Sequence, residues 1–248
     1  MAGHSHWAGI KHKKALIDAK RGKLWSKLSK AIIVAARSGG PDPDTNLRLR
    51  YAIDDAKAVS MPKDNIQRAI KRGAGESDGD ALEEIVYEGY GPNGVAILCE
   101  ILTDNRNRTA PEVRKIFDLA DGKMGTTGCV AWMFESKGMF LVGGEQADED
   151  RLMEVALDAG ADDVADLGEK FEVTCDPSVH QDVARGLAAA GITPEASQIT
   201  RVAQNMVELD AEAARKVLGL VERLEDHDDV QSVSHNANIP DEVLAEIG

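Results

Sequence analysis

The sequence predicts an α+β protein in which a three-helix N-terminal domain precedes two ferredoxin-like α/β domains, one inserted in the other. Residues 23–73 place apolar side chains at helical spacing between stretches rich in helix breakers. After residue 80, short strand and helix patterns alternate with tight turns, as in α+β sandwiches. Residues 80–135 hold too few elements to close a domain alone. We therefore expect a basic arm and helical bundle over 1–79, an α/β domain formed by 80–135 with 206–248, and an inserted α/β domain over 136–205.

The first predicted helix has one cationic and one apolar face. Residues 1–22 precede it as a polar arm rich in Lys and His. At about 100° per residue, Lys23, Lys27, Lys30 and Arg37 fall within about 80° of one another. The opposite side holds apolar residues: Leu24, Leu28, Ala31, Ile32 and Ala35. The helix is expected over 23–38, because Gly, Pro and Asp follow it up to Asn46.

Two further helices complete the predicted bundle. One is expected over 45–59, with Leu49, Ile53 and Ala56 on one face. The other begins at Pro62, where a missing N–H has no cost. We expect Gly73 to end it in the left-handed conformation.

The rest of the chain predicts the elements of the two α/β domains. Strands are expected over 84–89 and 95–103, and Thr109 to Glu112 resembles a capping box that opens a helix to about 120. Further β segments are expected over 130–134, 139–142, 170–174, 198–202 and 230–233. Further helices are expected over 148–160, 178–190 and 210–226.

Composition indicates a cytoplasmic protein that neither enters a membrane nor carries a secretory signal. The 248 residues are 43% hydrophobic and 29% charged, as in soluble globular proteins. No apolar run approaches ~18 residues, and the charged N-terminus lacks an apolar segment. Three widely spaced cysteines, Cys99, Cys129 and Cys175, suit neither a zinc site nor a disulfide framework. We expect each to be a small core residue in a reducing compartment.

The charge of the chain is divided between its two parts. Residues 1–73 contain 16 Lys and Arg against 6 Asp and Glu, whereas residues 74–248 contain 13 against 37. This asymmetry favours a polyanion partner for the N-terminal part, with the acidic body clear of the cationic face. A solvated basic face is the alternative. The candidate nucleic-acid-binding residues are Lys11, Lys13, Lys14, Lys20, Arg21, Lys23, Lys27, Lys30, Arg37, Arg68, Lys71 and Arg72.

The additional candidates are Trp7, Arg106 and Arg108. Trp7 lies in the basic arm, where an aromatic ring could stack on an unpaired base. Trp25 and Tyr51 also lie among basic residues, but a core position is favoured for Trp25. Arg106 and Arg108 could clamp phosphates or hold their loop to carboxylates of the chain, and we favour the second role.

No motif predicts catalysis, a metal or a cofactor. Phosphate-loop, dinucleotide-binding and HExxH patterns are absent from the sequence. His4, His6 and His12 could chelate copper or nickel only adventitiously. The acidic pair at 162–163 and the acidic segment 226–229 are expected to be solvated loop charges. The protein is therefore not expected to be an enzyme.

Several long motifs resemble those of the YebC/PmpR family, named as probable transcriptional regulatory proteins and related to the mitochondrial translational activator of cytochrome oxidase subunit one. The matching stretches are residues 2–14, 39–46, 61–66, 87–92, 103–109 and 130–134. The resemblance implies three domains, two of them α/β domains around a cleft, and no catalytic residues. It also implies a cytoplasmic DNA-binding regulator of transcription, or a ribosome-associated protein that assists translation.

Three functions are compatible with these observations. The first is a nucleic-acid-binding regulator whose partner is DNA by family description, or ribosomal RNA by charge distribution, because an acidic body would repel a long duplex. The second is an adaptor that binds protein, and the third is an enzyme using the cleft between the α/β domains.

Overall fold

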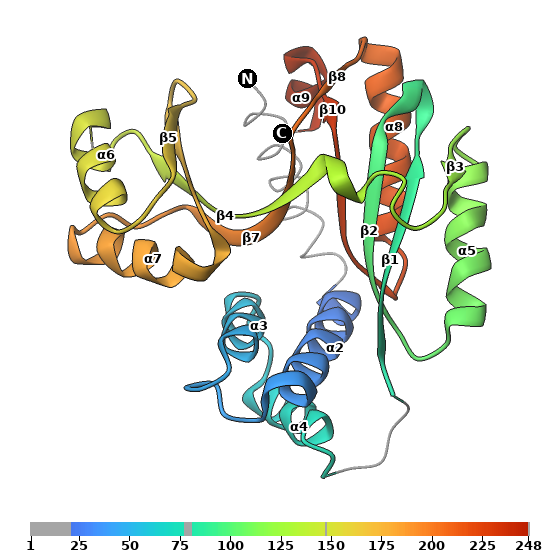
Figure 1. The fold of residues 1–248 in the computed structure, drawn as a ribbon, viewed down its shortest axis with the longest axis horizontal. Helices are drawn as coiled ribbons and strands as arrows, with labels where there is room; N and C mark the ends of the chain where they lie inside the picture. Colours follow the sequence, from blue (N-terminus) through green and yellow to red (C-terminus); the bar gives the residue numbers. More distant parts are fainter. Residues whose placement is uncertain (1–20, 77–80, 147, 248) are drawn as a thin grey trace.

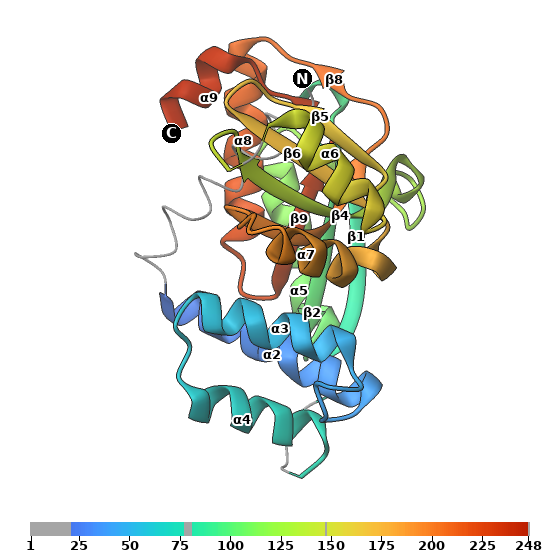
Figure 2. The ribbon, with the colours of Figure 1, turned by 90° about the vertical axis from the view of Figure 1, so that its left-hand side faces the viewer.

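A computed structural model describes residues 21–76, 81–146 and 148–247. Three helices form a bundle at one end of the molecule, and two sheets with their own helices lie beside each other above it (Figures 1 and 2). The chain is therefore an α+β protein with an N-terminal helical region, as predicted. Over these ranges, no helix is long and apolar enough to cross a membrane.

The N-terminal bundle consists of α2 (Arg21–Gly39), α3 (Leu47–Ala58) and α4 (Lys63–Gly73). The second half of α2 is more enclosed than its predicted apolar face, because five consecutive residues, 32–36, are buried. Leu82 and Leu102 from the first sheet unit join this core, so the bundle packs on the rest of the chain. Trp25 is half-buried against the same core, as predicted, and its indole N–H donates to the Val59 carbonyl at 3.3 Å.

Asn46 connects the end of α2 to the start of α3. Its side-chain oxygen accepts from the Leu49 N–H at 3.1 Å and caps α3. Its amide donates to the carbonyls of Ala35, at 2.8 Å, and Gly40, at 2.7 Å. Asn46, which is only 6% exposed, thus links the end of α2 to the start of α3 through its side chain.

Gly73 serves close packing rather than the predicted left-handed stop. Gly75, with φ of 81°, adopts that conformation after α4 ends. A Cβ on Gly73 would lie 2.4 Å from the Ile33 carbonyl oxygen and 2.7 Å from the Ala36 Cβ. The absence of a side chain there lets α4 approach α2 closely.

The first sheet has the antiparallel order β3-β1-β2-β9. Its strands are β1 (Glu83–Tyr90), β2 (Ala96–Thr103), β3 (Lys123–Met124) and β9 (Val230–His235). A 3-10 turn, η1 (Pro92–Gly94), joins β1 to β2. The helices α5 (Arg106–Asp118) and α8 (Ala211–Glu225) pack against it, with Phe117 and Leu220 fully buried. Strand β9 thus pairs with β2, and α8 packs on the same sheet.

The second sheet has the antiparallel order β5-β6-β4-β7. Its strands are β4 (Phe134–Gly143), β5 (Asp163–Asp166), β6 (Lys170–Cys175) and β7 (Ala196–Ala203). Two helices, α6 (Glu149–Asp158) and α7 (His180–Ala189), build a core against it, and the short η3 (Pro177–Val179) precedes α7. The chain order β-α-β-β-α-β with this strand order is the ferredoxin-like arrangement.

The two sheets share one spatial plan. In the first sheet β2, β3, β1 and β9 take the places of β4, β5, β6 and β7, but β1 comes first in the chain. The segment that holds the second sheet leaves and returns through adjacent strands, because Phe134 pairs with Ala203. The remaining short elements are η2 (Ala131–Met133), β8 (Val207–Glu208), β10 (Ala237–Asn238) and α9 (Asp241–Ile247).

Several local expectations are wrong. Helix α5 begins at Arg106 rather than at Thr109, and its cap is Asn105, which accepts from the Arg108 N–H. The predicted β segment 130–134 is mostly the 3-10 turn η2. Strand β5 occupies residues expected in a loop, since Asp163 begins it. Helices α6 and α8 each begin one residue later than predicted, because Asp148 and Asp210 are their N-caps.

Candidate nucleic-acid interface

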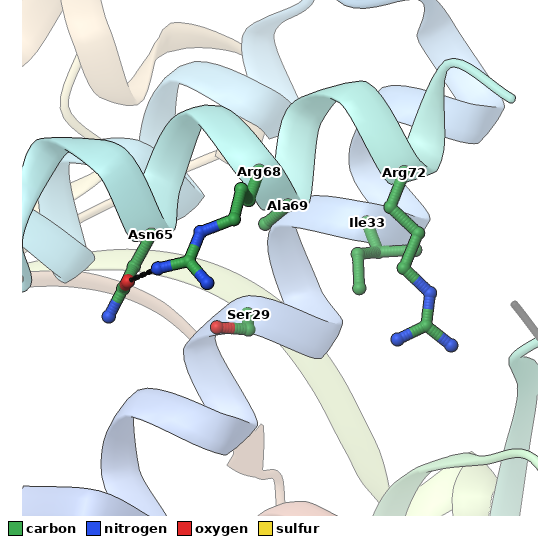
Figure 3. A pocket seen from close by; sticks show the side chains of 6 residues that line it. All are labelled: Ser29, Ile33, Asn65, Arg68, Ala69 and Arg72. Carbon is green, nitrogen blue, oxygen red and sulfur yellow. Dashed lines mark hydrogen bonds between the residues drawn. The ribbon is translucent and has the colours of Figure 1, made fainter. Parts of the chain in front are cut away.

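A depression of about 290 Å³ lies between α2 and α4 (Figure 3). Ser29 and Ile33 line it from α2, and four residues line it from α4: Asn65, Arg68, Ala69 and Arg72. Arg68 and Arg72 are one helical turn apart, so both side chains leave the same face of α4. Next to Arg72, α4 approaches α2 closely at Gly73.

The two arginines of the depression differ in how they are held. The Arg68 Nη2 donates to the Asn65 Oδ1 at 2.5 Å, and its Nε donates to the Asp64 carbonyl at 3.3 Å. The Arg72 guanidinium has no hydrogen bond or ion pair with any residue placed by the structure. Figure 3 shows its guanidinium extending away from α4 beyond Ile33, while Arg68 turns toward Asn65. Hydrogen bonds thus hold the Arg68 guanidinium in place, whereas the Arg72 guanidinium is available to a ligand.

The chemistry of the depression suits an oxyanion. Guanidinium groups donate paired hydrogen bonds to phosphate or carboxylate oxygens. Ser29 and Asn65 add a hydroxyl and an amide, and Ile33 and Ala69 provide an apolar wall. The lining includes neither a histidine nor a carboxylate that could act as a base. No group of three possible metal ligands occurs anywhere in residues 21–76, 81–146 and 148–247.

The lysine face of α2 (Lys23, Lys27 and Lys30) is partly covered by another part of the chain, contrary to expectation. The turn between α8 and β9, residues 225–229, lies against it. The Nζ of Lys23 donates to the Asp226 carbonyl at 2.9 Å, and that of Lys27 donates to the Glu225 carbonyl at 2.5 Å. Lys30 donates to the Asp228 carbonyl at 3.1 Å and to the Asp229 Oδ1 at 2.5 Å. The expectation that the acidic body stays clear of this face is therefore wrong.

Asp229 is the buried centre of this contact, although sequence analysis predicts a solvated loop charge. Asp229 is only 2% exposed. Besides Lys30, its carboxylate accepts from Arg108 at 2.7 Å and from the hydroxyls of Thr109, at 2.7 Å, and Thr103, at 3.1 Å. Burial alone would raise the pKa of the Asp229 carboxyl, but hydrogen bonds from Lys30, Arg108 and Thr109 hold it well below its usual range.

The other predicted cations lie in different places. Arg108 holds the carboxylates of Asp229 and Asp104, which is the favoured role for its segment, and Arg106 is exposed. Arg37 donates to the Leu82 carbonyl at 3.1 Å, whereas Lys71 is exposed beside Arg72. Five candidates lie outside the residues that the structure describes: Trp7, Lys11, Lys13, Lys14 and Lys20. Arg21 begins α2.

A second contact joins the bundle to the other sheet unit, and sequence analysis missed it. The Tyr51 hydroxyl of α3 lies 3.0 Å from the Nδ1 of His180, the first residue of α7. His180 is 3% exposed and stacks on Phe140 with ring centroids 4.4 Å apart. Its Nε2 lies 3.1 Å from the Ser197 Oγ, and burial lowers the pKa of the His180 imidazole. Tyr51, a candidate for base stacking, thus bonds to α7.

Two family models match most of the chain. One, described as the TACO1/YebC protein N-terminal domain, matches residues 5–76. The other, described as the TACO1/YebC second and third domain, matches residues 82–237.

Relatives and a solved structure match over almost the full length. A probable transcriptional regulatory protein of Rhodopirellula baltica is 59% identical, with 99% of this chain and 100% of the relative covered. One of Geobacter sulfurreducens is 53% identical, with 100% of each covered. The crystal structure of a conserved hypothetical protein from Aquifex aeolicus aligns with a TM-score of 0.83 and 48% identity, covering 95% of this chain and 97% of that one.

Proposed function

The chain belongs to the TACO1/YebC family, and on this premise we propose that it is a non-enzymatic regulator of gene expression that binds nucleic acid. The phosphate backbone binds at the depression between α2 and α4, where Arg68 and Arg72 contact it and Lys71 lies close by. Relatives named as probable transcriptional regulatory proteins support the regulatory role. The cytoplasm is the compartment we expect.

The observation that carries the proposal is the arrangement of Arg68 and Arg72. Most other cations of the bundle already have a partner within the chain, as Lys30 and Arg37 do. Arg72 has none among the residues placed by the structure, and Arg68 keeps one terminal nitrogen, Nη1, without a bond there. Two guanidiniums one turn apart, beside a hydroxyl, match the oxygens of neighbouring phosphates.

DNA and RNA remain two candidate partners. The names of the relatives favour DNA and transcription. The charge of the chain favours a folded RNA, because residues 74–248 carry 37 acidic against 13 basic side chains and would repel a long duplex. A ribosome-associated role in translation is therefore the second candidate.

The test measures binding of a 20-base-pair DNA duplex and a 20-nucleotide RNA hairpin over a range of salt concentrations. We compare the wild type with Arg68→Gln/Arg72→Gln. The control, Arg151→Gln/Arg185→Gln, removes the same two charges from exposed positions of α6 and α7.

Loss of two phosphate contacts is expected to weaken binding and to reduce the slope of log K against log salt by about 2 for duplex DNA. The control should keep both the affinity and the slope of the wild type. If the depression variant behaves like the control, this site does not bind the backbone. The nucleic acid bound more tightly by the wild type identifies the preferred partner.

A further inference from the structure

We propose that the turn between α8 and β9, residues 225–229, is a built-in competitor of nucleic acid that occupies the lysine face of α2 until phosphates replace it. This inference rests on the proposed function, and it adds a regulatory contact to the same interface. It concerns Lys23, Lys27 and Lys30, which sequence analysis predicts as phosphate ligands and which contact the turn instead.

The turn offers these lysines the kind of group that a phosphate backbone offers. Its main-chain carbonyls and its carboxylates present oxygens to the three lysines. The three carbonyls belong to Glu225, Asp226 and Asp228, at the end of a helix of 15 residues. A helix carries partial negative charge at this end. The turn therefore matches a short polyanion in sign.

The lysine face adjoins the depression on the same helix. Ser29 lines the depression, and Lys30 is the next residue, about 100° farther around α2. If the phosphate backbone of a nucleic acid bound by Arg68 and Arg72 continued around α2, it would reach the lysine face. The turn occupies that position, so extended binding requires it to move away.

The contact is strong at its centre and weak at its edge. Lys30 and Asp229 form a close, shielded pair, with side chains 19% and 2% exposed. Lys23 lies 3.6 Å from both the Asp226 and Asp228 carboxylates, whose side chains are 42% and 69% exposed. Exposed pairs of this kind are weak and screened by salt. Competition by phosphates would start at Lys23 and proceed inward.

The decisive variant changes the edge and leaves the buried centre intact. Asp226→Asn/Asp228→Asn removes two exposed carboxylates that face Lys23. The matched control, Glu154→Gln/Asp158→Asn, removes two exposed carboxylates from α6. Lysine substitutions are less informative, because they would remove the bonds to the turn and the phosphate ligands together.

The first measurement is the affinity of each full-length variant for the RNA hairpin and the DNA duplex at low salt. We expect the turn variant to bind about 3- to 10-fold more tightly than the control variant, as removal of two exposed ion pairs implies. The second measurement is hydrogen exchange of wild-type amides in residues 226–230. Nucleic acid should accelerate their exchange if it displaces the turn.

Each outcome decides between the alternatives. Equal affinity of the two variants, with amide exchange unchanged or slowed by nucleic acid, overturns the competitor and leaves the proposed function in place. Tighter binding without faster exchange also overturns it, since a general change of charge then explains the gain. If neither the wild type nor the turn variant binds nucleic acid, the proposed function fails together with this inference.

Discussion

At the scale of single residues, one buried carboxylate connects three distant parts of the chain. Asp229 precedes β9, and it accepts hydrogen bonds from Lys30 of α2 and Arg108 of α5. Two hydroxyls fill its remaining acceptor positions. Loss of this acceptor would leave Lys30, whose side chain is 19% exposed, without its carboxylate partner at a shielded position, whereas Arg108 would keep Asp104.

We expect Asp229→Asn to lower the free energy of unfolding by about 3–5 kcal/mol, the usual effect of breaking a buried ion pair. Urea denaturation at pH 7 measures it, with Asp226→Asn as the exposed control, expected within about 0.5 kcal/mol of wild type. The folded pKa of Asp229 is lowered, so its contribution is present above the unfolded pKa of about 4 and is lost as pH falls toward the folded pKa. The difference between wild type and variant should therefore shrink below about pH 4. An equal difference at pH 3 and pH 7 would contradict this assignment.

Two glycines in helices should respond to alanine in opposite directions. Gly73→Ala places a methyl group 2.4 Å from the Ile33 carbonyl oxygen, and we expect a loss of about 1–3 kcal/mol. Gly219 lies inside α8, and a Cβ there would have no neighbour within 4 Å. Gly219→Ala should stabilise by about 0.5–1 kcal/mol through helix propensity. Thermal unfolding compares the two, and a stabilised Gly73→Ala would show that α2 and α4 are not in close contact.

At the scale of elements, the contact between α3 and α7 gives the bundle a second anchor that depends on pH. His180 keeps a neutral ring between the Tyr51 and Ser197 hydroxyls, since burial lowers its pKa. Because the His180 pKa is lower in the folded protein, the unfolded chain binds a proton more readily than the folded one. This difference acts once the pH falls below the unfolded histidine pKa of about 6.5. Stability is then lost as pH falls through this value.

We expect the free energy of unfolding of the wild type to decrease more steeply between pH 7 and pH 5 than that of His180→Gln. Denaturation of both proteins at each pH measures the two slopes. Parallel curves for wild type and His180→Gln would show that His180 does not titrate in this range.

The sequence predicts elements with strong local patterns and misses those that depend on partners. Helices α2, α3 and α4 follow from apolar spacing, and Asp148 and Asp210 begin α6 and α8 as caps. Strand β5 lacks such a pattern, because only one of its four residues, Val164, is buried. The role of Asp229 was missed for another reason: its partners lie 121 and 199 positions away.

The candidate site was predicted in composition but not in arrangement. Helical spacing correctly groups Lys23, Lys27 and Lys30 on one face, yet spacing within a helix does not indicate what packs against it. Arg68 and Arg72 were among the predicted ligands, but their depression exists only because α4 packs on α2. Net charge identified the basic part of the chain, and tertiary contact selected which of its cations remain available.

At the scale of the whole molecule, the chain enters the second sheet unit through β4 and leaves it through β7. Ser136 and Arg201 are opposite each other in these strands. The unit also reaches the bundle through α7, where Arg50 donates to the Gln181 side chain at 3.1 Å beside the Tyr51 contact. Because the unit is connected through two paired strands, we expect that it can be removed without unfolding the first sheet. Because α7 contacts the bundle, we expect its removal to lower the stability of the bundle.

Replacing residues 137–200 by Asn-Gly should leave a protein that folds. The dipeptide suits a two-residue turn between the paired Ser136 and Arg201. We expect cooperative unfolding, retained binding of the nucleic acid preferred by the wild type, and lower stability, because the bundle loses its contact with α7. Circular dichroism and a binding titration measure these properties. Loss of cooperative unfolding would show that the first sheet cannot form without the second unit.

The position of Asp229 in the chain has a consequence for biosynthesis. Lys30 and Arg108 are made early, whereas their shared acceptor comes 199 residues after the first and 121 after the second. Until that residue emerges, the nascent bundle has no counter-charge for Lys30, and the outer edge of β2 lacks its partner β9. The segment that contains Asp229 therefore completes the attachment of the N-terminal bundle, and a product truncated before it would expose a basic helix that the finished protein covers.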